Sequence, residues 1–385
     1  MPMEELLIVT QRTLHTAPRI IREIEALQAD FRIHTIGLTP PKASVQSHTH
    51  SAILEESTSF KALRKLRRVL LNRYIARTHI QKSKLRRVNK LLHDLKPSVV
   101  ICHECFDVPY FAALKEKYGY KLVFNAHEYY PLEFDEDPKW ASTWQLYYED
   151  LYRQILPSVD LFINVCDSIR EKCLEVFGVD SLVIPNASFY HACEPTEVHQ
   201  PIRLIHHGGA IQSRKIEEMI DVAKLLGPQY ELSLMLMPID SGYFDELKAL
   251  AAPLPNVKFI ETVPFSSIVP TLNTYDMGIY ILPPTSFNNA IALPNKLYEF
   301  IQAKLTVAIG PSPEMARIVN EHQVGIVANS FQAADLAKAI QALSIEDIRT
   351  FKANTQAAAQ KLSAEQYNER LKDHILALLE PVRLN

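Results

Sequence analysis

Two segments in the second half of the chain combine backbone freedom with positive charge. In the first, Gly208 and Gly209 directly follow a predicted strand, and Arg214 and Lys215 stand at the entry to the next predicted helix. Glycine lets backbone N–H groups approach an anion closely, and the helix N-terminus adds positive potential. The segment therefore predicts a phosphate site; the alternative is a tight turn that needs glycine at positive φ.

The second segment places a lysine and a glutamate around another predicted helix start. Pro294 is placed to begin the helix, Asn295 and Lys296 fall in its first turn, and Glu299 lies one turn further. Free N–H groups and a lysine favour a second anion site. Glu299 is suited to accept hydrogen bonds from a ribose diol, or it is a surface glutamate favoured near a helix start. Together the two segments predict a diphosphate clamped from two sides.

Parallel strands are needed to bring these segments together. Short apolar runs alternate with helical patterns along the whole chain, which indicates βαβ units and an α/β fold of two doubly wound, Rossmann-like domains. Such sheets bind ligands at the carboxyl ends of their strands, where both segments fall. The predicted strands are 5–10, 31–38, 98–102, 121–125, 161–165, 182–184, 203–207, 231–237, 257–261, 277–282, 306–309 and 325–327. Predicted helices include 17–27, 108–117, 168–177, 216–226, 295–303 and 314–321.

A proline-containing stretch with little periodicity divides the chain. We therefore expect a first domain at 1–185, a linker at 186–200, a second domain at 201–362 and a C-terminal helix at 363–385.

Composition limits the remaining functions. The 385 residues carry a net charge of −3 and five cysteines, an odd number that argues against a disulfide framework and for a reducing compartment. The N-terminus lacks the pattern of a signal peptide, and we find no run of 18 apolar residues, so we expect a cytoplasmic protein. Cys102 and Cys105 form a CxxC pair without a second pair to complete a zinc site, so we expect no metal and no other cofactor.

One segment is strongly basic. Residues 61–90 hold twelve Lys/Arg and no Asp/Glu, and leucines recur at helical spacing, for example Leu63, Leu66 and Leu70. The segment predicts either a solvated helix face or contact with an anionic lipid surface or acceptor. It lacks the interleaved aromatic residues of single-strand binders, so we expect no nucleic-acid partner.

Several segments resemble family-4 glycosyltransferases, which have the GT-B fold. HHGGAIQSRKIEEMI (206–220) and ALPNKLYEFIQAKLTVAIGPSPEM (292–315) are similar to the two donor-site motifs of a subgroup with a PNKL(F/Y)E(Y/F) sequence. In the first half, ICHECFDVPYFAAL (101–114) and KLVFNAHEYY (121–130) resemble the family's "HAHD" and "LVYDAHE" segments. The resemblance spans most of the chain and implies C-terminal helices that cross back to the first domain.

The resemblance also implies roles for individual residues. It places the diphosphate of a nucleotide-sugar on Gly209, Arg214 and Lys296, the ribose on Glu299 and the base near Val263. His127 would lie near the donor sugar. The implied catalytic residues are His127, Arg214 and Lys296. The implied donor-binding residues are Gly208, Gly209, Arg214, Val263, Asn288, Asn289, Asn295, Lys296, Leu297 and Glu299. The acceptor-side candidates are His15, Arg19, His103 and Glu104.

Two positions depart from the family pattern. Many members carry a glutamate eight residues before the position of Glu299, where this chain has Ile291; Asn288 and Asn289 would have to take over its polar contacts. Asn125 stands where an aspartate is common. The loss of the glutamate keeps two alternatives open, a UDP-sugar 2-epimerase on the same fold and a catalytically silent GT-B partner subunit.

The expected function is therefore transfer of a sugar from a UDP- or GDP-sugar to a glycan or lipid-linked acceptor. By the resemblance, the transfer would retain the anomeric configuration and need no metal. Its expected setting is the assembly of bacterial surface polysaccharide (capsule, lipopolysaccharide or exopolysaccharide), at the inner face of the membrane through residues 61–90.

Overall fold

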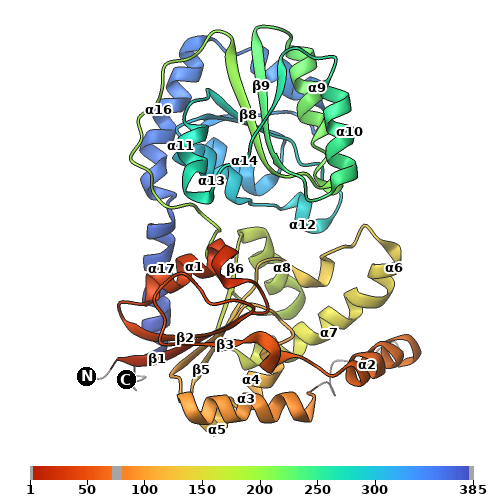
Figure 1. Ribbon diagram of the computed structural model, residues 1–385, viewed down its shortest axis with the longest axis vertical. Helices are drawn as coiled ribbons and strands as arrows, with labels where there is room; N and C mark the ends of the chain where they lie inside the picture. Colours follow the sequence, from red (N-terminus) through yellow and green to blue (C-terminus); the bar gives the residue numbers. More distant parts are fainter. Residues whose placement is uncertain (1–2, 72–79, 381–385) are drawn as a thin grey trace. The chain divides into compact units, whose positions relative to one another are not determined.

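The computed structural model describes residues 3–71 and 80–380. The chain divides into two compact units, Met1–Pro185 with Tyr367–Asn385, and Asn186–Gln366. Each unit is built around one parallel sheet with helices packed on it (Figure 1). The predicted α/β class with two Rossmann-like domains is confirmed.

The first unit holds, within its described residues, a seven-stranded sheet in the order β3-β2-β1-β4-β5-β6-β7. Its strands are β1 (Glu4–Val9), β2 (Phe31–Gly37), β3 (Ser47–His50), β4 (Val99–Cys102), β5 (Lys121–Asn125), β6 (Leu161–Asn164) and β7 (Leu182–Val183). Strand β3 was not predicted because its sequence, SHTH, has no apolar residue. It pairs with β2 at the edge of the sheet, where little burial is required.

Helices cover this sheet and supply much of its core. The helices in the described part of this unit include α1 (Pro18–Leu27), α2 (Thr58–Leu71), α3 (Lys82–Leu95), α4 (Val108–Ala112), α5 (Lys115–Tyr118), α6 (Pro138–Trp140), α7 (Leu146–Ile155) and α8 (Asp167–Phe177). The predicted helix 108–117 is thus two short helices. Ile20 and Ile24 of α1 pack with Leu6 and Ile8 of β1 in one buried cluster. Leu371, from α17 (Ala364–Leu379), joins the same cluster, so the C-terminal helix returns to the first unit.

The second unit holds, in its described part, a six-stranded sheet in the order β10-β9-β8-β11-β12-β13. Its strands are β8 (Ile202–Gly209), β9 (Tyr230–Met237), β10 (Val257–Ile260), β11 (Met277–Tyr280), β12 (Thr306–Ile309) and β13 (Gly325–Val327). The prediction that the glycine pair follows the strand is wrong in detail. Gly208 and Gly209 are the last residues of β8, because β9 continues to pair with them at Leu236 and Met237.

The helices of this unit lie on both faces of its sheet. In Figure 1, α9 (Glu217–Leu226) and α10 (Ser241–Ala251) lie on one side of β8 and β9, and α11 (Ile268–Leu272) and α13 (Asn295–Gln302) on the other. The remaining helices are α12 (Phe287–Ala290), α14 (Pro313–His322), α15 (Ala333–Gln341) and α16 (Ile345–Lys361). This two-sided cover explains why the strands are almost continuously apolar.

The basic segment 61–90 forms two helices in its described part, α2 and α3, and its members differ in burial. Lys84 is buried, with Nζ 2.9 Å from Asp107 Oδ1 and 3.9 Å from the centroid of the Tyr110 ring. Arg87 donates to the carbonyls of Ile53 and Glu55 at 3.0 and 2.5 Å. At these two positions the charged groups bind other parts of the first unit, so they belong neither to a solvated helix face nor to a lipid-binding surface. Arg73, Tyr74 and Arg77 lie outside the described residues.

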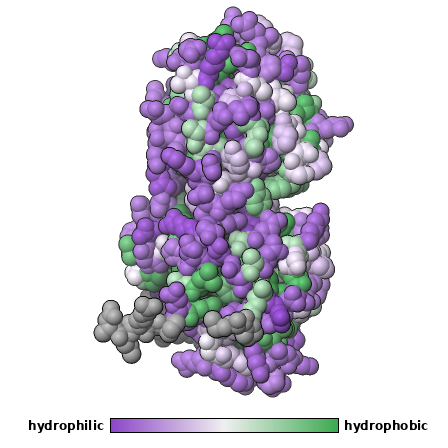
Figure 2. Space-filling model, turned by 90° about the vertical axis from the view of Figure 1, so that its left-hand side faces the viewer, coloured by the Kyte–Doolittle hydropathy of each residue, from purple (hydrophilic) through white to green (hydrophobic). Residues whose placement is uncertain are grey.

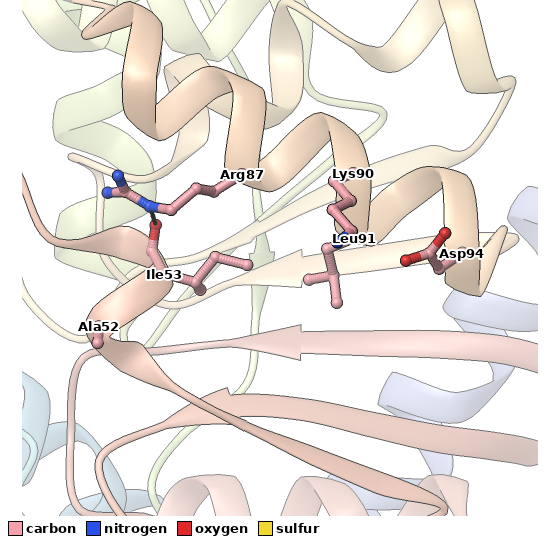
Figure 3. Close-up of a pocket in the computed structure, with 6 residues that line it drawn as sticks. All are labelled: Ala52, Ile53, Arg87, Lys90, Leu91 and Asp94. Carbon is pink, nitrogen blue, oxygen red and sulfur yellow. Dashed lines mark hydrogen bonds between the residues drawn. The ribbon is translucent and has the colours of Figure 1, made fainter.

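A pocket of about 420 Å³ lies beside α3 in the first unit (Figure 3). Its lining residues are Ala52, Ile53, Arg87, Lys90, Leu91 and Asp94. The Arg87 guanidinium is occupied by backbone carbonyls, and Lys90 and Asp94 offer opposite charges. The lining of this pocket therefore does not favour an anion such as a phosphate.

None of the helices in residues 3–71 and 80–380 is long and apolar enough to cross a bilayer. Figure 2 shows a face of the molecule that is largely hydrophilic, with hydrophobic residues in small groups.

Candidate functional site

The second unit has a topological switch point between β8 and β11. Chain connections leave β8 toward β9 on one side, while β11 starts the other half of the sheet. Ligands of open α/β sheets bind in the crevice that this reversal creates at the carboxyl ends of the strands. The two segments singled out in the sequence follow β8 and β11 and therefore flank this point.

Arg214 and Lys296 converge on Gly208 at the end of β8. A Cβ atom placed on Gly208 would lie 3.6 Å from Arg214 Nη1 and 3.7 Å from Lys296 Nζ. Gly208 has φ +125°, a conformation that side-chain-bearing residues rarely adopt. Arg214 belongs to a 3-10 turn, Gln212–Arg214, and Lys296 to the first turn of α13. Two separate elements thus direct cations at one bare stretch of backbone.

Lys296 is an unusually buried cation, with 7% of its surface exposed. Its Nζ lies 3.8 Å from the centroid of the Tyr280 ring and 3.2 Å from His206 Nε2. Burial, and then the neighbouring Arg214 charge, lower the pKa of Lys296 well below its ordinary value. A bound anion would offset both costs, since it would pair with the two cations at once.

His206 contacts the ammonium group of Lys296 through its ring. Its Nδ1 donates to the carbonyl of Ile279 at 3.0 Å, because a carbonyl can only accept. The neutral ring therefore presents the Nε2 lone pair to Lys296. Burial and the Lys296 charge lower the pKa of His206, which keeps the ring neutral.

Glu299 is buried rather than on the surface, with 5% exposed. Its Oε2 lies 3.3 Å from His207 Nε2, without the alignment of a hydrogen bond. Burial, followed by the Lys296 charge, lowers the pKa of His207 to about 3, so the ring is neutral. The surface alternative for Glu299 is wrong, whereas its contact with a ribose stays a prediction.

The other predicted donor residues follow the carboxyl ends of β10 and β11, and none of them is among the atoms nearest to Gly208. Asn288 and Asn289 are in the short helix α12, where Asn289 Nδ2 donates to Thr285 Oγ1 at 2.7 Å. Ile291 is buried at 8% exposed, so a side chain there packs in the core instead of facing solvent. Asn295 and Leu297 belong to α13, and Leu297 is a core residue. Val263 lies in the loop after β10 and is half-buried.

Lys215 does not join the cluster. Its Nζ lies 3.6 Å from Glu217 Oε1, and 43% of its side chain is exposed. The expectation that Lys215 reaches the same phosphates as Arg214 is therefore not what the structure shows. Its φ of +49° turns the chain between the 3-10 turn and α9 and directs the two side chains differently.

The first unit has its own switch point, between β1 and β4. Glu104, just after β4, accepts hydrogen bonds from Thr10 Oγ1 at 2.9 Å and from the Gln11 N–H at 3.1 Å. Burial raises the pKa of Glu104. Both oxygens thus hold the loop after β1, which makes Glu104 a structural residue of this loop. His15, in the same loop, is bonded through Nδ1 to Thr39 Oγ1 at 2.7 Å.

Five polar side chains, four of them buried and His127 half-buried, form a hydrogen-bonded series in this unit. Arg19 Nη2 donates to Asn125 Oδ1, and Asn125 Nδ2 donates to Glu23 Oε1 at 2.9 Å. Glu23 Oε2 lies 2.8 Å from His103 Nε2, and His103 Nδ1 lies 2.9 Å from His127 Nε2. His103 is fully buried with both nitrogens occupied, so its side chain is not exposed to a ligand, and its acceptor-side role stays a prediction.

Sequence reasoning missed Glu23, the centre of this chain. A signal was present, because Arg19, Arg22 and Glu23 share the helix face of the apolar Ile20, Ile24 and Leu27. Charged residues on the core-facing side of an amphipathic helix need buried partners. The sequence does not show which partners these are.

The Cys102–Cys105 pair lies in a buried environment. Both thiols are free and buried, and burial raises their pKa well above the ordinary value, which keeps them protonated. Within the described residues, no group of three or more His, Cys, Asp or Glu side chains is placed to hold a metal ion.

Comparisons with known proteins agree with this architecture. Residues 20–187 match the family model described as Glycosyltransferase Family 4. No curated protein matches the sequence. Among solved structures, Anabaena Alr3699/HepE in complex with UDP is 14% identical, with a TM-score of 0.71, over 98% of this chain and 100% of that chain.

Two further structures have the same architecture. The sucrose-phosphate synthase (tll1590) of Thermosynechococcus elongatus is 13% identical, with a TM-score of 0.69, over 97% of this chain and 99% of that chain. A glycosyltransferase of Rickettsia africae is 11% identical, with a TM-score of 0.67, over 98% and 99%. At these identities the likeness concerns the fold, and the chain has the GT-B fold.

Proposed function

We propose that this protein is a glycosyltransferase that moves a sugar from a UDP- or GDP-sugar to a glycan or lipid-linked acceptor. The observation that carries the proposal is the convergence of Arg214 and Lys296 on Gly208 at the switch point of the second unit. The match of residues 20–187 to Glycosyltransferase Family 4 supports it. So does the similar fold of the Anabaena protein, which has been solved with UDP and with UDP-glucose.

The site suits the difficult step of this reaction. When the bond between the anomeric carbon and the diphosphate breaks, negative charge grows on the leaving group. Arg214 and Lys296 are already held where that charge would develop, so little reorganisation is needed. In the proposed mechanism no metal is required, because the two cations and the N-terminus of α13 neutralise the diphosphate.

We further propose that the configuration of the sugar is retained. The acceptor oxygen then bonds to the anomeric carbon on the face that the diphosphate leaves, and the acceptor proton passes to a diphosphate oxygen. His127 would orient a hydroxyl in this step instead of removing its proton. The biological setting proposed is assembly of bacterial surface polysaccharide.

The proposal is tested by screening UDP-, GDP- and ADP-sugars for thermal stabilisation, followed by assays of nucleotide release with and without acceptor glycans. We expect one nucleotide class to raise the melting temperature, because a ligand that binds only the native state stabilises it. Release that depends on acceptor supports transfer. Sugar isomerisation without acceptor would instead identify the 2-epimerase. Nucleotide-sugar binding without turnover would identify a silent subunit, the alternative that follows from the buried Ile291 in place of a glutamate.

The basic residues of the segment 61–90 other than Lys84 and Arg87 are proposed to bind an anionic membrane surface. Each basic residue near such a surface contributes about 1 kcal/mol. We expect a variant with four arginines replaced by glutamine to lose sedimentation with phosphatidylglycerol vesicles, and high salt to have the same effect on the wild type. The replaced residues are Arg64, Arg67, Arg68 and Arg73.

The control variant carries the same loss of charge on exposed helix positions of the second unit. Its replaced residues are Lys224, Lys338, Arg349 and Lys361. It should sediment like the wild type. Equal sedimentation of the arginine variant and the wild type would contradict membrane binding through this segment.

A further inference from the structure

We propose that Glu23 is a positioning residue that fixes the tautomer of His127, leaving His127 Nδ1 to accept a hydrogen bond from a hydroxyl of the bound sugar or acceptor. The inference rests on the proposed function for the identity of this hydroxyl. Its structural part, the tautomer, concerns the first unit alone and is measurable without any substrate.

Arg19 sets the direction of the hydrogen bonds at one end of this series of side chains. A guanidinium can only donate, so the oxygen of the Asn125 amide must face Arg19 and its NH2 group must face Glu23. The two possible orientations of the amide are therefore not equivalent. Arg19 carries the positive charge that the Glu23 carboxylate balances within the buried chain.

Glu23 then sets the direction of the hydrogen bonds to the two histidines. An ionised carboxylate can only accept, so its Oε1 takes the Asn125 hydrogen and its Oε2 takes the hydrogen on His103 Nε2. The Nδ1 of a neutral His103 is then an acceptor, and the hydrogen in the contact with His127 belongs to His127 Nε2. His127 Nδ1 is left with its lone pair.

Charge balance favours neutral rings in this chain. Arg19 and Glu23 already cancel, and an imidazolium would add an unpaired buried charge. Burial, followed by the nearby Arg19 charge, lowers the pKa of His127 well below its ordinary value. His103 is fully buried, whereas His127 is half-buried and its Nδ1 has no hydrogen-bond partner among the described residues. His127 is thus the end of the chain at which a ligand can bind.

The same argument explains Asn125, the departure from the family's aspartate. An aspartate could not donate to Glu23, and two carboxylates would face each other across the contact that now measures 2.9 Å. Asparagine satisfies Arg19 and Glu23 together. The network therefore depends on an amide at this position.

The first test is the tautomer of each histidine, measured by nitrogen-15 NMR of protein labelled on histidine. We expect His103 and His127 to carry their hydrogen on Nε2 in the wild type, each assigned by the loss of its signals in a His→Gln variant. A wild-type His127 protonated on Nδ1 would overturn the proposal, and no other variant needs to fold for this result.

Glu23→Gln should reverse the direction of the hydrogen bonds that run from this residue to His103 and His127. Arg19 still orients Asn125, so the oxygen of the new glutamine side chain must face Asn125 and its NH2 group must face His103. His103 and His127 should then both move their hydrogen to Nδ1, which turns His127 Nδ1 from an acceptor into a donor. Glu25→Gln, on the exposed side of the same helix, is the matched control and should leave both tautomers unchanged.

Kinetics provide the second test. Glu23→Gln should lower kcat by about tenfold or more, as loss of an outer partner of a functional histidine does, with little change in donor KM. A reversed tautomer with unchanged kcat would overturn the positioning role and leave the transferase proposal intact. If the wild type itself transfers no sugar, the proposed function fails, while the tautomer measurement still decides the structural part.

Discussion

Replacing Lys296 with methionine should lower sugar transfer by about 10²–10³-fold, the loss expected when one preorganised donor to a developing anion is removed. Methionine keeps an unbranched apolar stem against Tyr280, so the fold should survive. Donor binding should weaken as well, because Lys296 is one of two cations directed at Gly208. The measurement is steady-state kinetics together with calorimetric titration of the nucleotide-sugar.

Arg214→Ala should act in the same direction, and Lys224→Met supplies the control. Lys224 belongs to the same unit, but it is exposed in the last turn of α9 and is not among the atoms nearest to Gly208. Its replacement should change neither binding nor turnover. Wild-type turnover in both the Lys296 and the Arg214 variants would show that the diphosphate binds elsewhere.

The lowered pKa of Lys296 adds a dependence on pH to this prediction. Only the ammonium form can pair with a diphosphate, and burial destabilises that form in the free protein. As the pH rises through the lowered pKa, the ammonium is lost and donor affinity should fall. The fall should begin below pH 10.5, where an ordinary lysine titrates, and Lys296→Met should lack this component.

Gly208→Ala should weaken donor binding by at least about tenfold, equivalent to about 1.4 kcal/mol, although it removes no charge. The new methyl group would lie 3.6 Å from Arg214 Nη1 and 3.7 Å from Lys296 Nζ, in the space that a phosphate oxygen needs. The φ of +125° adds backbone strain of about 1–3 kcal/mol, so the melting temperature should fall too.

Gly227→Ala separates these two effects. Gly227 ends α9 in the same unit at φ +73°, and a Cβ there meets no atom within 4 Å. This variant should lose stability and keep donor affinity. Equal donor affinities in the two variants, measured by titration with the nucleotide-sugar, would place the diphosphate away from Gly208.

The scaffold was predictable because its signals are local. Continuous apolar strands separated by amphipathic helices specify parallel sheets, and strands such as Lys121–Asn125 and Thr306–Ile309 fall where the pattern places them. Strand β3 was missed because its residues are polar. It lies at the edge of its sheet, so it does not change the order of the strands around the switch point.

Part of the candidate site was predictable as well. Glycine at a strand end, a basic residue before a helix and a lysine in a first turn indicate an anion site wherever they occur. Gly208, Arg214 and Lys296 were therefore found one by one from their types and positions. That they share one point was an inference from the rule for open sheets, and the distances at Gly208 agree with it.

The sequence by itself determined the α/β scaffold and the residue types that can hold a diphosphate. The reason is that strands and helix starts depend on the types of a few neighbouring residues. Only the tertiary structure decided which charged side chains converge on the candidate site and which pair within the fold. Lys84 and Lys296 both lie in the first turn of a helix, yet one pairs with Asp107 and the other lies with Arg214 against Gly208. Glu23 meets His103 across 80 residues of chain. Such partners are set by how strands order in a sheet, and burial then fixes the protonation of each group.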